Sequence, residues 1–557
     1  MKNRLYYGDN LDILRNREYF PDECVDLIYL DPPFNSNRDH NVLFKAESGA
    51  DSEAQITVFE DTWHWGETAE ETYRDLIVNA PEKVSTAIEA LLNLIDRNQM
   101  MAYLVMMTAR LVELRRVLKP TGSLYLHCDP TASHYLKIVL DAIFGPTSFR
   151  NEIIWQRAPS KGLASRRLPT NHDVILAYQK SQMAHWNADN MFIPYDMDKL
   201  DEKVLEQYSN VDEDGRRYQL TSLTNPNKNR PNLTYEFLGI NRVWRWTKER
   251  MKQAYEEGIV VQTKPGAVPR QKRYLDEQKG RPLGDIWTDI PPLQGSSAEY
   301  MDYPTQKPLA LMERIIRGSS NEGEIVFDPF CGCGTTCAAA HKLDRKWIGI
   351  DITHLGISLQ KHRLGNMFEL VSGEDYEVIG EPTTEAGARE LAQDSANEGR
   401  YQFEWWALSL VGAKPVGGQA GSRRGKKGAD KGIDGIINFF EQDDKGKPKP
   451  KKVIVQVKSG KVKAGDIHEL RGVIEREKAA IGVFITLENP TQPMVKEALA
   501  AGWYESTLWQ KPYRKLQILT IGDLLGGAAV DMPSPHGTFK QAELHVSTDG
   551  VAQKDLI

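Results

Sequence analysis

Residues 25–34 read VDLIYLDPPF, an apolar run that ends in an acidic residue, two prolines and an aromatic residue. The run Val25–Leu30 is typical of a short buried strand that ends at Asp31. Downstream, helical periodicity covers residues 87–95 and 101–118, a turn leads into a strand over residues 123–127, and another helix covers residues 136–144. This alternation predicts an α/β domain with a doubly wound parallel sheet.

The loop Asp31-Pro32-Pro33-Phe34 carries the clearest chemical signal in the chain. Consecutive prolines remove backbone donors and stiffen the loop, which leaves its carbonyl groups free to accept hydrogen bonds. A base amine offers two N–H donors, and the Asp31 carboxylate and the Pro32 carbonyl can accept both. Phe34 supplies a flat face on which an extruded base can stack. The competing interpretation is a proline-rich turn after a strand.

The middle of the chain has a different character. From about Asn151 to Pro292 it is richer in Arg, Asn, Tyr and Trp, and turns are frequent. The alternating pattern then resumes with a helix over residues 308–318, a strand over 324–327, a helix over 335–343 and a strand over 347–350. A sheet that pauses and resumes predicts a module inserted into one catalytic domain.

A second loop follows the strand that resumes the pattern. Residues 327–336 read FDPFCGCGTT, and glycines at a strand-to-helix junction allow a ligand to approach the backbone. One helix and one strand later comes Asp351, where an acidic side chain bonds ribose hydroxyls in dinucleotide-binding folds. The combination of strand, glycine loop, helix, strand and acid predicts a cofactor site.

Together these motifs resemble the S-adenosylmethionine-dependent amino-methyltransferases of DNA, in their β-type order. In that order the Asp-Pro-Pro-aromatic motif comes first, then a target-recognition region, then the cofactor loop. Thr305-Gln306-Lys307-Pro308 resembles the family's further cofactor-binding motif, and Gly8-Asp9 resembles its segment near the cofactor adenine. The resemblance covers roughly residues 1–375 and implies a Rossmann-like methyltransferase sheet.

The resemblance also implies the roles of individual residues. Asp31, Pro32, Pro33 and Phe34 would be catalytic. The cofactor S-adenosylmethionine would be bound by Asp9, Lys307, Asp328, Phe330, Gly332, Gly334, Thr335 and Asp351. Asp at the first motif position implies adenine N6, since enzymes for cytosine N4 usually carry Ser there. Phe at the fourth position departs from the usual Tyr, but stacking needs only the ring. No Pro-Cys pair occurs, so direct transfer without a covalent intermediate is expected.

Two groups of residues that contain cysteine can be interpreted either as functional sites or as structural side chains. Cys331, Cys333 and Cys337 could suggest zinc, but no second Cys pair or spaced His pair completes a ligand set. Small side chains packed within the glycine loop are the better interpretation. The run His127-Cys128-Asp129 could suggest a nucleophile, but its place at a strand end favours a structural role.

Composition sets the broader limits. The chain has 557 residues, 40% apolar and 26% charged, with a formal net charge of −7, so several globular domains are expected rather than a uniformly basic coat. No apolar run approaches the roughly 20 residues of a membrane span, and no signal core follows Met1. Five cysteines fit a reducing compartment, and we expect a cytoplasmic protein.

Two basic stretches, Arg157–Arg167 and Arg423–Lys463, are candidate contacts to double-stranded DNA; the competing interpretation is a solvated surface. In the first stretch, phosphates could meet Arg157, Lys161, Arg166 and Arg167. The inserted region is expected to choose the DNA sequence. Trp244 and Trp246 lie in that region and are predicted to be core residues.

The C-terminal part has its own pattern. Glu404 lies in an aromatic-rich helix over residues 403–411, and Asp434 precedes a strand over 436–439. A further strand over 453–458 reads VIVQVK. This resembles the PD-(D/E)xK nuclease fold in its Mrr-like branch, where Gln replaces the acid. The competing interpretation is an ordinary strand pair.

The nuclease resemblance implies a Mg²⁺ site. Asp434, Glu404 and the side-chain carbonyl of Gln456 would hold the ion, and Lys458 would orient or activate the attacking water. Gln is a neutral and weaker metal ligand than Glu.

The predicted organisation is a methyltransferase domain over residues 1–380 with a target-recognition insertion at about 151–300, a linker over 381–400, a smaller α/β nuclease domain over 401–527 and a tail over 528–557. The leading hypothesis is a restriction–modification enzyme. The alternatives are a methyltransferase of adenine N6 or cytosine N4 whose C-terminal domain only binds DNA, a DNA-binding module built on a decayed methyltransferase, and methylation of RNA or protein amines. The oligomeric state is open, with a homodimer as one arrangement.

Overall fold

The computed structural model describes residues 2–33, 65–159, 168–294, 297–301, 303, 305–394, 399–416, 432–442 and 447–535. The chain divides into two compact units, Met1–Asn187 with Asp285–Ile557, and Ala188–Gly284. We call the second of these the inserted unit. Within the described residues, no helix is both long and apolar enough to cross a membrane.

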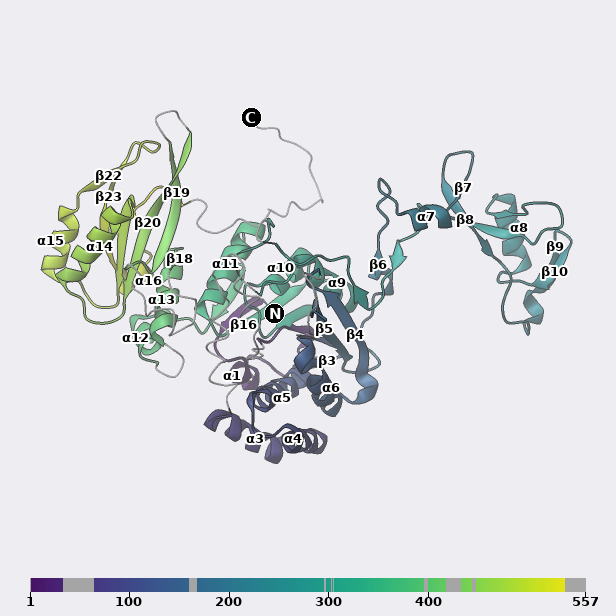
Figure 1. The fold of residues 1–557 in the computed structure, drawn as a ribbon, viewed down its shortest axis with the longest axis horizontal. Helices are drawn as coiled ribbons and strands as arrows, with labels where there is room; N and C mark the ends of the chain where they lie inside the picture. The colour runs from purple at the N-terminus through teal and green to yellow at the C-terminus, as the bar shows by residue number, and fades with distance from the viewer. Residues whose placement is uncertain are drawn as a thin grey trace. The chain divides into compact units, whose positions relative to one another are not determined.

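Nine strands form the main sheet of the larger unit, in the spatial order β14-β4-β5-β3-β2-β15-β16-β1-β17. They are β1 Asn3–Tyr7, β2 Val25–Leu30, β3 Leu118–Cys128, β4 Phe149–Gln156, β5 His172–Gln179, β14 Ile286–Trp287, β15 Ile325–Asp328, β16 Lys346–Asp351 and β17 Tyr376–Ile379. β5 runs antiparallel to β3 and β4, and the other neighbouring pairs of this described sheet are parallel. The doubly wound sheet predicted from the sequence is confirmed, and it is parallel as predicted except at β5 (Figure 1).

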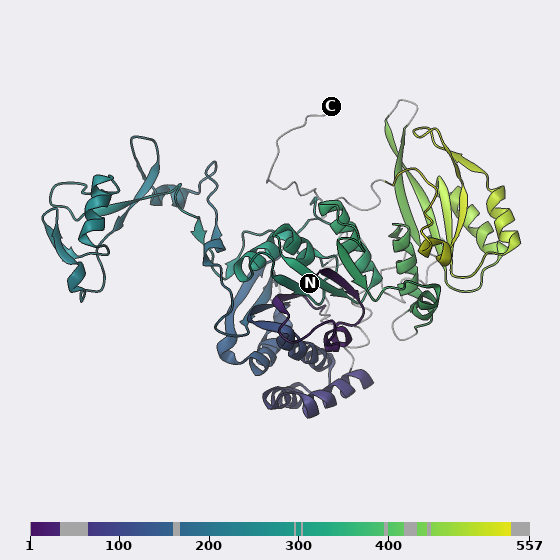
Figure 2. The same cartoon turned by 180° about the vertical axis from the view of Figure 1, so that it is seen from behind.

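Helices cover both faces of this sheet, as Figures 1 and 2 show from opposite sides. One face carries α1 Asn10–Arg15, α5 Gln99–Val117 and α6 Pro130–Phe144, with α3 Glu67–Asn79 and α4 Glu82–Ile95 packed outside them. The other face carries α9 Leu309–Ser319, α10 Thr335–Lys342 and α11 His354–Phe368. Every residue of β2 is buried, as expected for a strand covered on both faces.

The order of the strands brings the two predicted loops together. β2 and β15 are parallel neighbours, with Leu27 paired to Val326, although they come from distant parts of the sequence. The loop after β2 and the loop after β15 therefore leave the sheet at the same edge. β16 lies beside β15, and β1 beside β16, so Asp351 and Asp9 reach that edge as well. Ligands of open α/β sheets bind at this carboxyl edge.

The inserted unit is shorter than the insertion that composition predicts at about 151–300. β4 and β5 lie within the predicted range but belong to the main sheet. β5 reads HDVILAYQ and is buried from Asp173 to Gln179. Its apolar content, rather than the frequent turns around it, decides its place in the sheet.

The inserted unit is built from short elements around a small core. They are β6 Phe192–Ile193, α7 Glu202–Gln207, β7 Asn210–Val211, β8 Arg217–Ser222, β9 Thr234–Phe237, β10 Ile240–Val243, α8 Lys248–Glu256, β11 Val260–Val261, β12 Arg270–Tyr274 and β13 Arg281–Pro282. The strands form a four-stranded sheet, β11-β12-β8-β7, and two pairs, β9-β10 and β6-β13. Trp244 is fully buried and Trp246 packs against the same cluster, so the prediction that both belong to a core is confirmed.

The C-terminal region forms a second, smaller α/β domain within the larger unit. Its elements are α12 Glu385–Gln393, α13 Gly399–Leu410, β18 Lys414–Pro415, β19 Gly435–Gln442, β20 Pro448–Lys458, α14 Ala464–Arg476, β21 Ile481–Thr486, α15 Gln492–Ala500, β22 Trp503–Glu505, β23 Pro512–Arg514, β24 Leu516–Thr520 and α16 Ile521–Leu525. Five strands form a sheet in the order β18-β19-β20-β21-β24. α14 and α15 cover one face, and α13 and α16 cover the other (Figures 1 and 2).

The segment predicted as a linker, residues 381–400, contains helix α12. Ala388 is fully buried in the same cluster as Phe403, and α12 packs on α13 and α16. Leu391 and Ala392 pack against this cluster too, which makes a narrow apolar stripe at positions i, i+3 and i+4. The polar composition of the segment hides this stripe, because three apolar residues suffice to dock a helix of nine.

The predicted tail, residues 528–557, begins in contact with the C-terminal domain. Val530 and Met532 pack against its buried core. The backbone N–H of Asp531 donates to Oε1 of Gln517 at 2.9 Å. Residues 536–557 lie outside the described residues.

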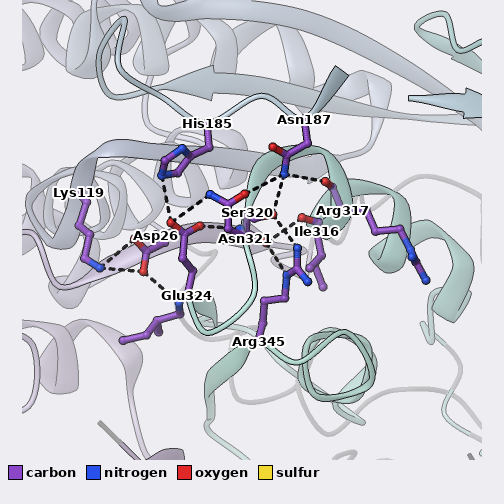
Figure 3. A network of polar contacts seen from close by, with 11 residues as sticks. Asp26, Lys119, His185, Asn187, Ile316, Arg317, Ser320, Asn321, Glu324 and Arg345 are labelled. Carbon is purple, nitrogen blue, oxygen red and sulfur yellow. Dashed lines mark hydrogen bonds and ion pairs between the residues drawn. The ribbon is translucent and has the colours of Figure 1, made fainter. Parts of the chain in front are cut away.

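A polar network holds the opposite edge of the main sheet, away from the two loops (Figure 3). Nζ of Lys119 lies 2.8 Å from both carboxylate oxygens of Asp26, and the backbone N–H of Ile325 donates to Oδ2 of Asp26 at 3.0 Å. Asp26 is almost completely buried. The network therefore joins the beginnings of β2, β3 and β15, and two of these strands, β2 and β15, lead into the predicted site.

The same network fixes the chain just before the inserted unit begins. Nδ2 of Asn187 donates to the backbone oxygens of Arg317 and Ser320, at 3.1 and 2.9 Å. His185 lies 3.0 Å from Glu324. These bonds tie the segment after β5 to the end of α9 and the start of β15 (Figure 3).

Replacing Asp26 with Ala is expected to lower the free energy of unfolding by about 2–3 kcal/mol. The substitution leaves the Ile325 N–H and the Lys119 ammonium without their acceptor, although Lys119 is exposed enough to regain some hydration. Denaturant unfolding measures the loss. Glu18→Ala, which removes an exposed carboxylate, is the matched control and should change stability by less than about 0.5 kcal/mol. Equal effects of the two substitutions would contradict the prediction.

Candidate active sites

Asp31, Pro32 and Pro33 follow β2 directly and lie at the carboxyl edge of the sheet. The Asp31 carboxylate forms an ion pair with Lys307 through Oδ2. Its other oxygen, Oδ1, has no hydrogen-bond partner in the described part of the chain. One carboxylate oxygen therefore stays available for a further donor. Phe34, predicted to stack on a base, lies outside the described residues.

Lys307, predicted from the resemblance to bind the cofactor, contacts Asp31 in this structure. The segment that carries it is held in place. The buried amide of Gln306 accepts a hydrogen bond from the Met301 N–H at 2.8 Å and donates to the Glu299 carbonyl at 2.6 Å. The Lys307 side chain therefore starts from a fixed backbone.

The glycine loop after β15 has a backbone that only glycine tolerates well. Gly332 and Gly334 adopt φ values of +49° and +76°, in the left-handed region. A Cβ on Gly332 would lie 3.1 Å from the Tyr303 ring, and one on Gly334 would lie 2.6 Å from Cγ of Gln360. The loop therefore presents bare backbone immediately before the start of α10, where N–H groups favour a carboxylate or phosphate.

Thr335, the first residue of α10, is buried and already has a partner. Its hydroxyl accepts a hydrogen bond from Nη1 of Arg363 at 2.7 Å. Arg363 lies on α11 and is also buried, with Nε 3.0 Å from Sδ of Met301. Arg363 was not among the residues predicted from the sequence. It braces the loop from the neighbouring helix.

Asp328, another predicted cofactor residue, shapes the glycine loop from inside the protein. Its Oδ1 accepts a hydrogen bond from the Phe330 N–H at 3.0 Å, and its Oδ2 accepts one from the Thr336 hydroxyl at 2.6 Å. Asp328 is 3% exposed and Phe330 7%. Burial raises the pKa of Asp328 to about 7, although these two hydrogen bonds act in the opposite direction.

Asp351, predicted to bond ribose hydroxyls, ends β16 beside the glycine loop. Its Oδ2 accepts a hydrogen bond from the Gly332 N–H at 2.8 Å, and its Oδ1 accepts one from the Thr353 N–H at 2.8 Å. The Gly8 N–H donates to the Asp351 carbonyl at 3.0 Å. Asp351 therefore joins the glycine loop to the segment that carries Asp9.

Asp9 is held by a buried arginine that the sequence analysis did not single out. Nη2 of Arg110 lies 3.1 and 2.8 Å from the two carboxylate oxygens of Asp9. Nε of Arg110 donates to Oδ1 of Asn10 at 2.5 Å, and Nδ2 of Asn10 donates to the Pro329 carbonyl at 2.8 Å. Burial lowers the pKa of Arg110, and the charge of Asp9 opposes this. The signal available in the sequence was that Arg110 is the first charged residue after the uncharged first part of helix α5.

The C-terminal domain brings three of its four predicted residues to one strand end. The Asp434 N–H donates to the Val455 carbonyl at 3.0 Å, and Oδ2 of Asp434 accepts from the Val457 N–H at 2.7 Å. Asp434 therefore lies beside the end of β20, where Gln456 and Lys458 are located. Glu404 lies half-buried on α13, which packs against β20.

Lys458 has an acidic partner that the sequence analysis did not identify. Its Nζ lies 3.0 Å from Oδ1 of Asp466 at the start of α14. Asp466 is buried, and its Oδ2 accepts the Lys463 N–H at 2.8 Å, so its carboxylate is fixed. Asp466 therefore holds the Lys458 ammonium at the end of β20.

Gln456 is a candidate metal ligand, because its buried side-chain oxygen is unsatisfied within the part of the chain that the structure describes. It is 5% exposed, and its Oε1 has no hydrogen-bond partner among the described residues. A buried carbonyl oxygen without a partner costs free energy, and a hard cation would satisfy it. No cluster of three or more His, Cys, Asp or Glu side chains with metal-binding spacing occurs in the described ranges. A magnesium site here therefore depends on the Gln456 carbonyl as a ligand.

Comparison with known proteins fits this geometry. A family model described as DNA methylase, of the N6 and N4 type, matches residues 25–357. The chain belongs to this DNA methylase family. A second family model, described as restriction endonuclease and of the Mrr catalytic type, matches residues 398–511. The sequence of the C-terminal domain therefore matches that of a restriction endonuclease domain.

Individual relatives are similar over parts of the chain. The Type II methyltransferase M.EcaI of Enterobacter cloacae is 32% identical over 45% of this chain and 54% of its own length. The Type III restriction-modification enzyme StyLTI Mod subunit of Salmonella typhimurium is 24% identical over 71% of this chain and 58% of its own length. The chain thus spans little more than half of these relatives. The crystal structure of the M1.HpyAVI–SAM complex is 17% identical with a TM-score of 0.30, over 65% of this chain and 98% of that one.

The three cysteines of the methylase's glycine loop pack inside the domain. A Cβ on Gly349 would lie 2.9 Å from Sγ of Cys331 and 3.0 Å from Sγ of Cys337. Burial raises the pKa of these two thiols and of Cys333. Protonated, buried thiols fit the interpretation that small side chains fill the loop.

His127, Cys128 and Asp129 have structural partners in the methylase region. The two ring nitrogens of His127 lie 2.9 Å from the Tyr29 hydroxyl and 3.1 Å from Oδ2 of Asp173. Asp129 caps α6 by accepting the Thr131 N–H at 2.7 Å. Cys128 is buried. These contacts agree with the structural interpretation of the run.

Arg157, predicted to meet DNA phosphates, lies 3.3 Å from Oδ1 of Asp173. Burial opposes ionisation of Asp173, but the hydrogen bond from His127 and the charges of Arg157 and Lys307 outweigh it and lower the pKa. The other three predicted phosphate contacts, Lys161, Arg166 and Arg167, lie outside the described residues. In the second basic stretch, Arg423–Lys463, residues 423–431 and 443–446 also lie outside the described residues.

Asp328 should make the stability of the methylase region depend on pH. A folded-state pKa of about 7 exceeds the ordinary value of 3.8, so the folded state binds the proton more tightly. The stabilisation is fully present below pH 3.8 and disappears as the pH rises through 7. Relative to Asp328→Asn, the wild type should lose about 4 kcal/mol of unfolding free energy across that range. Urea unfolding of both proteins at several pH values measures the difference, and parallel profiles would contradict it.

Proposed function

We propose that this methylase transfers a methyl group from S-adenosylmethionine to N6 of adenine in double-stranded DNA. The observation that carries the proposal is the shared sheet edge, where the Asp31 loop after β2 and the glycine loop after β15 leave neighbouring strands. A cofactor held by the second loop would lie beside an amine held by the first.

The residues at the glycine loop fit S-adenosylmethionine. Gly332 and Gly334 adopt positive φ values, so the loop keeps a tight turn directly before the N–H groups at the start of α10, which favour the carboxylate of a ligand. Asp9 would lie near the cofactor adenine, and Asp351 supplies carboxylate oxygens that ribose hydroxyls can share. When bound, the cofactor supplies an electrophilic methyl group.

The methyl acceptor would be positioned by the loop after β2. Oδ1 of Asp31 and the Pro32 carbonyl would accept the two N–H bonds of the amine, which turns its lone pair toward the methyl group. The Asp31 carboxylate would also stabilise the positive charge that develops on the nitrogen. Phe34 would stack on the extruded base. The surplus proton of the methylated amine would then leave to solvent.

Adenine is the proposed base because Asp stands at the first position of the Asp31 motif. A relative supports this choice. The DNA adenine methyltransferase YhdJ of Escherichia coli is 40% identical over 116 residues, which are 19% of this chain. The competing base is cytosine, methylated at N4.

Sequencing of modified bases tests the proposal. The protein is expressed in a host without DNA methyltransferases, and its DNA is read by a method that separates N6-methyladenine from N4-methylcytosine. We expect N6-methyladenine in one short sequence motif. N4-methylcytosine would contradict the choice of base. Unmodified DNA, together with unmodified RNA and protein, would contradict methyl transfer altogether.

We also propose that the inserted unit, Ala188–Gly284, selects the DNA sequence, within a methyltransferase domain over residues 1–380. Two of its arginines stack on aromatic rings: Arg250 lies 4.4 Å from the Trp246 ring centroid, and Arg216 lies 4.0 Å from that of Tyr274. Such rigid planar pairs suit contacts to phosphates and base edges. Transplanting this unit from a relative with a known target should transfer the methylated motif.

The C-terminal domain, residues 401–527, is proposed to be a Mg²⁺-dependent endonuclease. Asp434, Gln456 and Glu404 would hold the ion, which supplies Lewis-acid activation of a phosphate and a water. Asp466 keeps Lys458 at the strand end, where its ammonium would orient the attacking water. The partnerless Gln456 oxygen supports this assignment.

A second candidate function is a methylase whose C-terminal domain only binds DNA. Gln456 favours it, because a neutral ligand at the position of the usual acid weakens a metal site. Under both candidate functions the protein would act on DNA in the cytoplasm. The protein as a whole would be a restriction–modification enzyme only if its C-terminal domain cleaves DNA. Light scattering of the purified protein would decide between a monomer and the proposed alternative, a homodimer.

A further inference from the structure

The Asp31–Lys307 pair is more than a surface contact. The side chains are 24% and 16% exposed, so both charges are partly removed from water. Nζ of Lys307 also lies 3.3 Å from the Thr305 carbonyl, which holds the ammonium from the other side. Charge-assisted hydrogen bonds in such surroundings are stronger and better oriented than exposed ion pairs.

The backbone on both sides of the pair is fixed. Asp31 follows the fully buried strand β2 directly and precedes two prolines. Lys307 lies between the buried Gln306 and Leu309, whose N–H donates to Oε2 of Glu299 at 3.1 Å. Two fixed backbones joined by one ion pair leave the Asp31 carboxylate little freedom to rotate.

We infer that Lys307 is a positioning residue that orients the Asp31 carboxylate for the target amine. Lys307 takes Oδ2, and Oδ1 stays open for one N–H of the amine while the Pro32 carbonyl takes the other. Without Lys307 the carboxylate would rotate, and its open oxygen would no longer be aligned with that carbonyl. The inference rests on the proposed methyl transfer and differs from the expectation that Lys307 binds the cofactor.

The test compares Lys307→Met and Lys307→Arg with the wild type. With DNA that contains the mapped motif and saturating S-adenosylmethionine, Lys307→Met should lower kcat about 10- to 100-fold, since a small misplacement of a reacting group has an effect of that size. The Kd for S-adenosylmethionine, measured by titration calorimetry, should change less than about threefold, which is below the 1.4 kcal/mol of a tenfold effect. Lys307→Arg keeps the charge and should recover most of kcat.

The matched control is Lys119→Met. Lys119 pairs with Asp26 at the other end of β2, 2.8 Å away (Figure 3). This variant should lose thermal stability but keep both kcat and Kd. A loss of kcat equal to that of Lys307→Met would show a general effect on β2 and would overturn the inference.

Two further results would overturn it. One is an unchanged kcat for Lys307→Met. The other is an intact kcat with a Kd weakened tenfold or more, which would make Lys307 a cofactor ligand. If Lys307→Met does not fold, Lys307→Gln is compared with Lys307→Arg in the same assays.

A double-mutant cycle tests the pair without any activity. The losses in Tm of Asp31→Asn and Lys307→Met should not add in the double variant, because both remove the same interaction. Additive losses would overturn the inference. An inactive wild type with coupled Tm losses would instead reject the proposed function while leaving the pair established.

Discussion

Asp31→Ala is expected to lower methyl transfer at least about 1,000-fold, because it removes both the acceptor for the target amine and the charge that stabilises the developing cation. The variant should still bind S-adenosylmethionine, since the glycine loop and its braces, Asp328 and Arg363, are unchanged. Transfer of a labelled methyl group to DNA measures the rate, and titration calorimetry measures cofactor binding.

Asp31→Asn provides the graded control. An amide keeps one oxygen acceptor but loses the charge, so its rate should lie between those of the Ala variant and the wild type. Asp26→Asn changes a carboxylate on the same strand at the other edge and should keep the rate within a few fold. Methyl transfer by Asp31→Ala at the wild-type rate would remove Asp31 from the mechanism and leave the proline-rich turn as the interpretation.

The second large effect concerns the C-terminal domain. Asp434→Ala and Lys458→Ala should each abolish Mg²⁺-dependent cleavage of unmethylated DNA, a loss of at least about 100-fold. Asp434 is tied to the strand end by the Val457 N–H, and Lys458 by Asp466, so each substitution removes a side chain that is held at the proposed metal site. Plasmid cleavage measured over time gives the rates, and DNA binding is measured in parallel.

Methyl transfer serves as the internal control for these variants, because the methylase site lies on a different sheet and should keep its rate. Asp466→Asn keeps an acceptor for the Lys458 ammonium but loses the charge, and should reduce cleavage less than Lys458→Ala does. Cleavage that is unchanged in Asp434→Ala would reject the nuclease assignment. DNA binding without cleavage in the wild type would favour the second candidate function.

The sequence predicted the methylase fold well because several of its strands are continuous apolar runs next to clear turn or loop residues. Val25–Leu30 was predicted as a buried strand, and the structure places β2 at those residues with every position buried. The glycine loop was predicted between a strand and a helix, and β15 and α10 flank it. Such local patterns directly reflect burial and backbone geometry.

Segments in which a short apolar pattern lies among polar residues were harder to predict. β5 was included in an insertion because its surroundings are polar, although the strand itself is apolar. α12 was taken as a linker because only a narrow stripe, centred on Ala388, docks on the core. In both cases average composition over a long window hid a short apolar pattern.

The sequence by itself determined the two loops, the strand that precedes each of them and the residues with side chains able to act in catalysis. Each of these features depends on neighbours within a few positions. It identified Asp31 and Lys458, but not what holds them. Lys307 reaches Asp31 across 276 positions, and Arg110 reaches Asp9 across 101. Only the tertiary structure decided these pairs, because which charged side chains meet depends on which strands and helices become neighbours. Asp31 belongs to a local motif, whereas its ion-pair partner Lys307 comes from a distant segment.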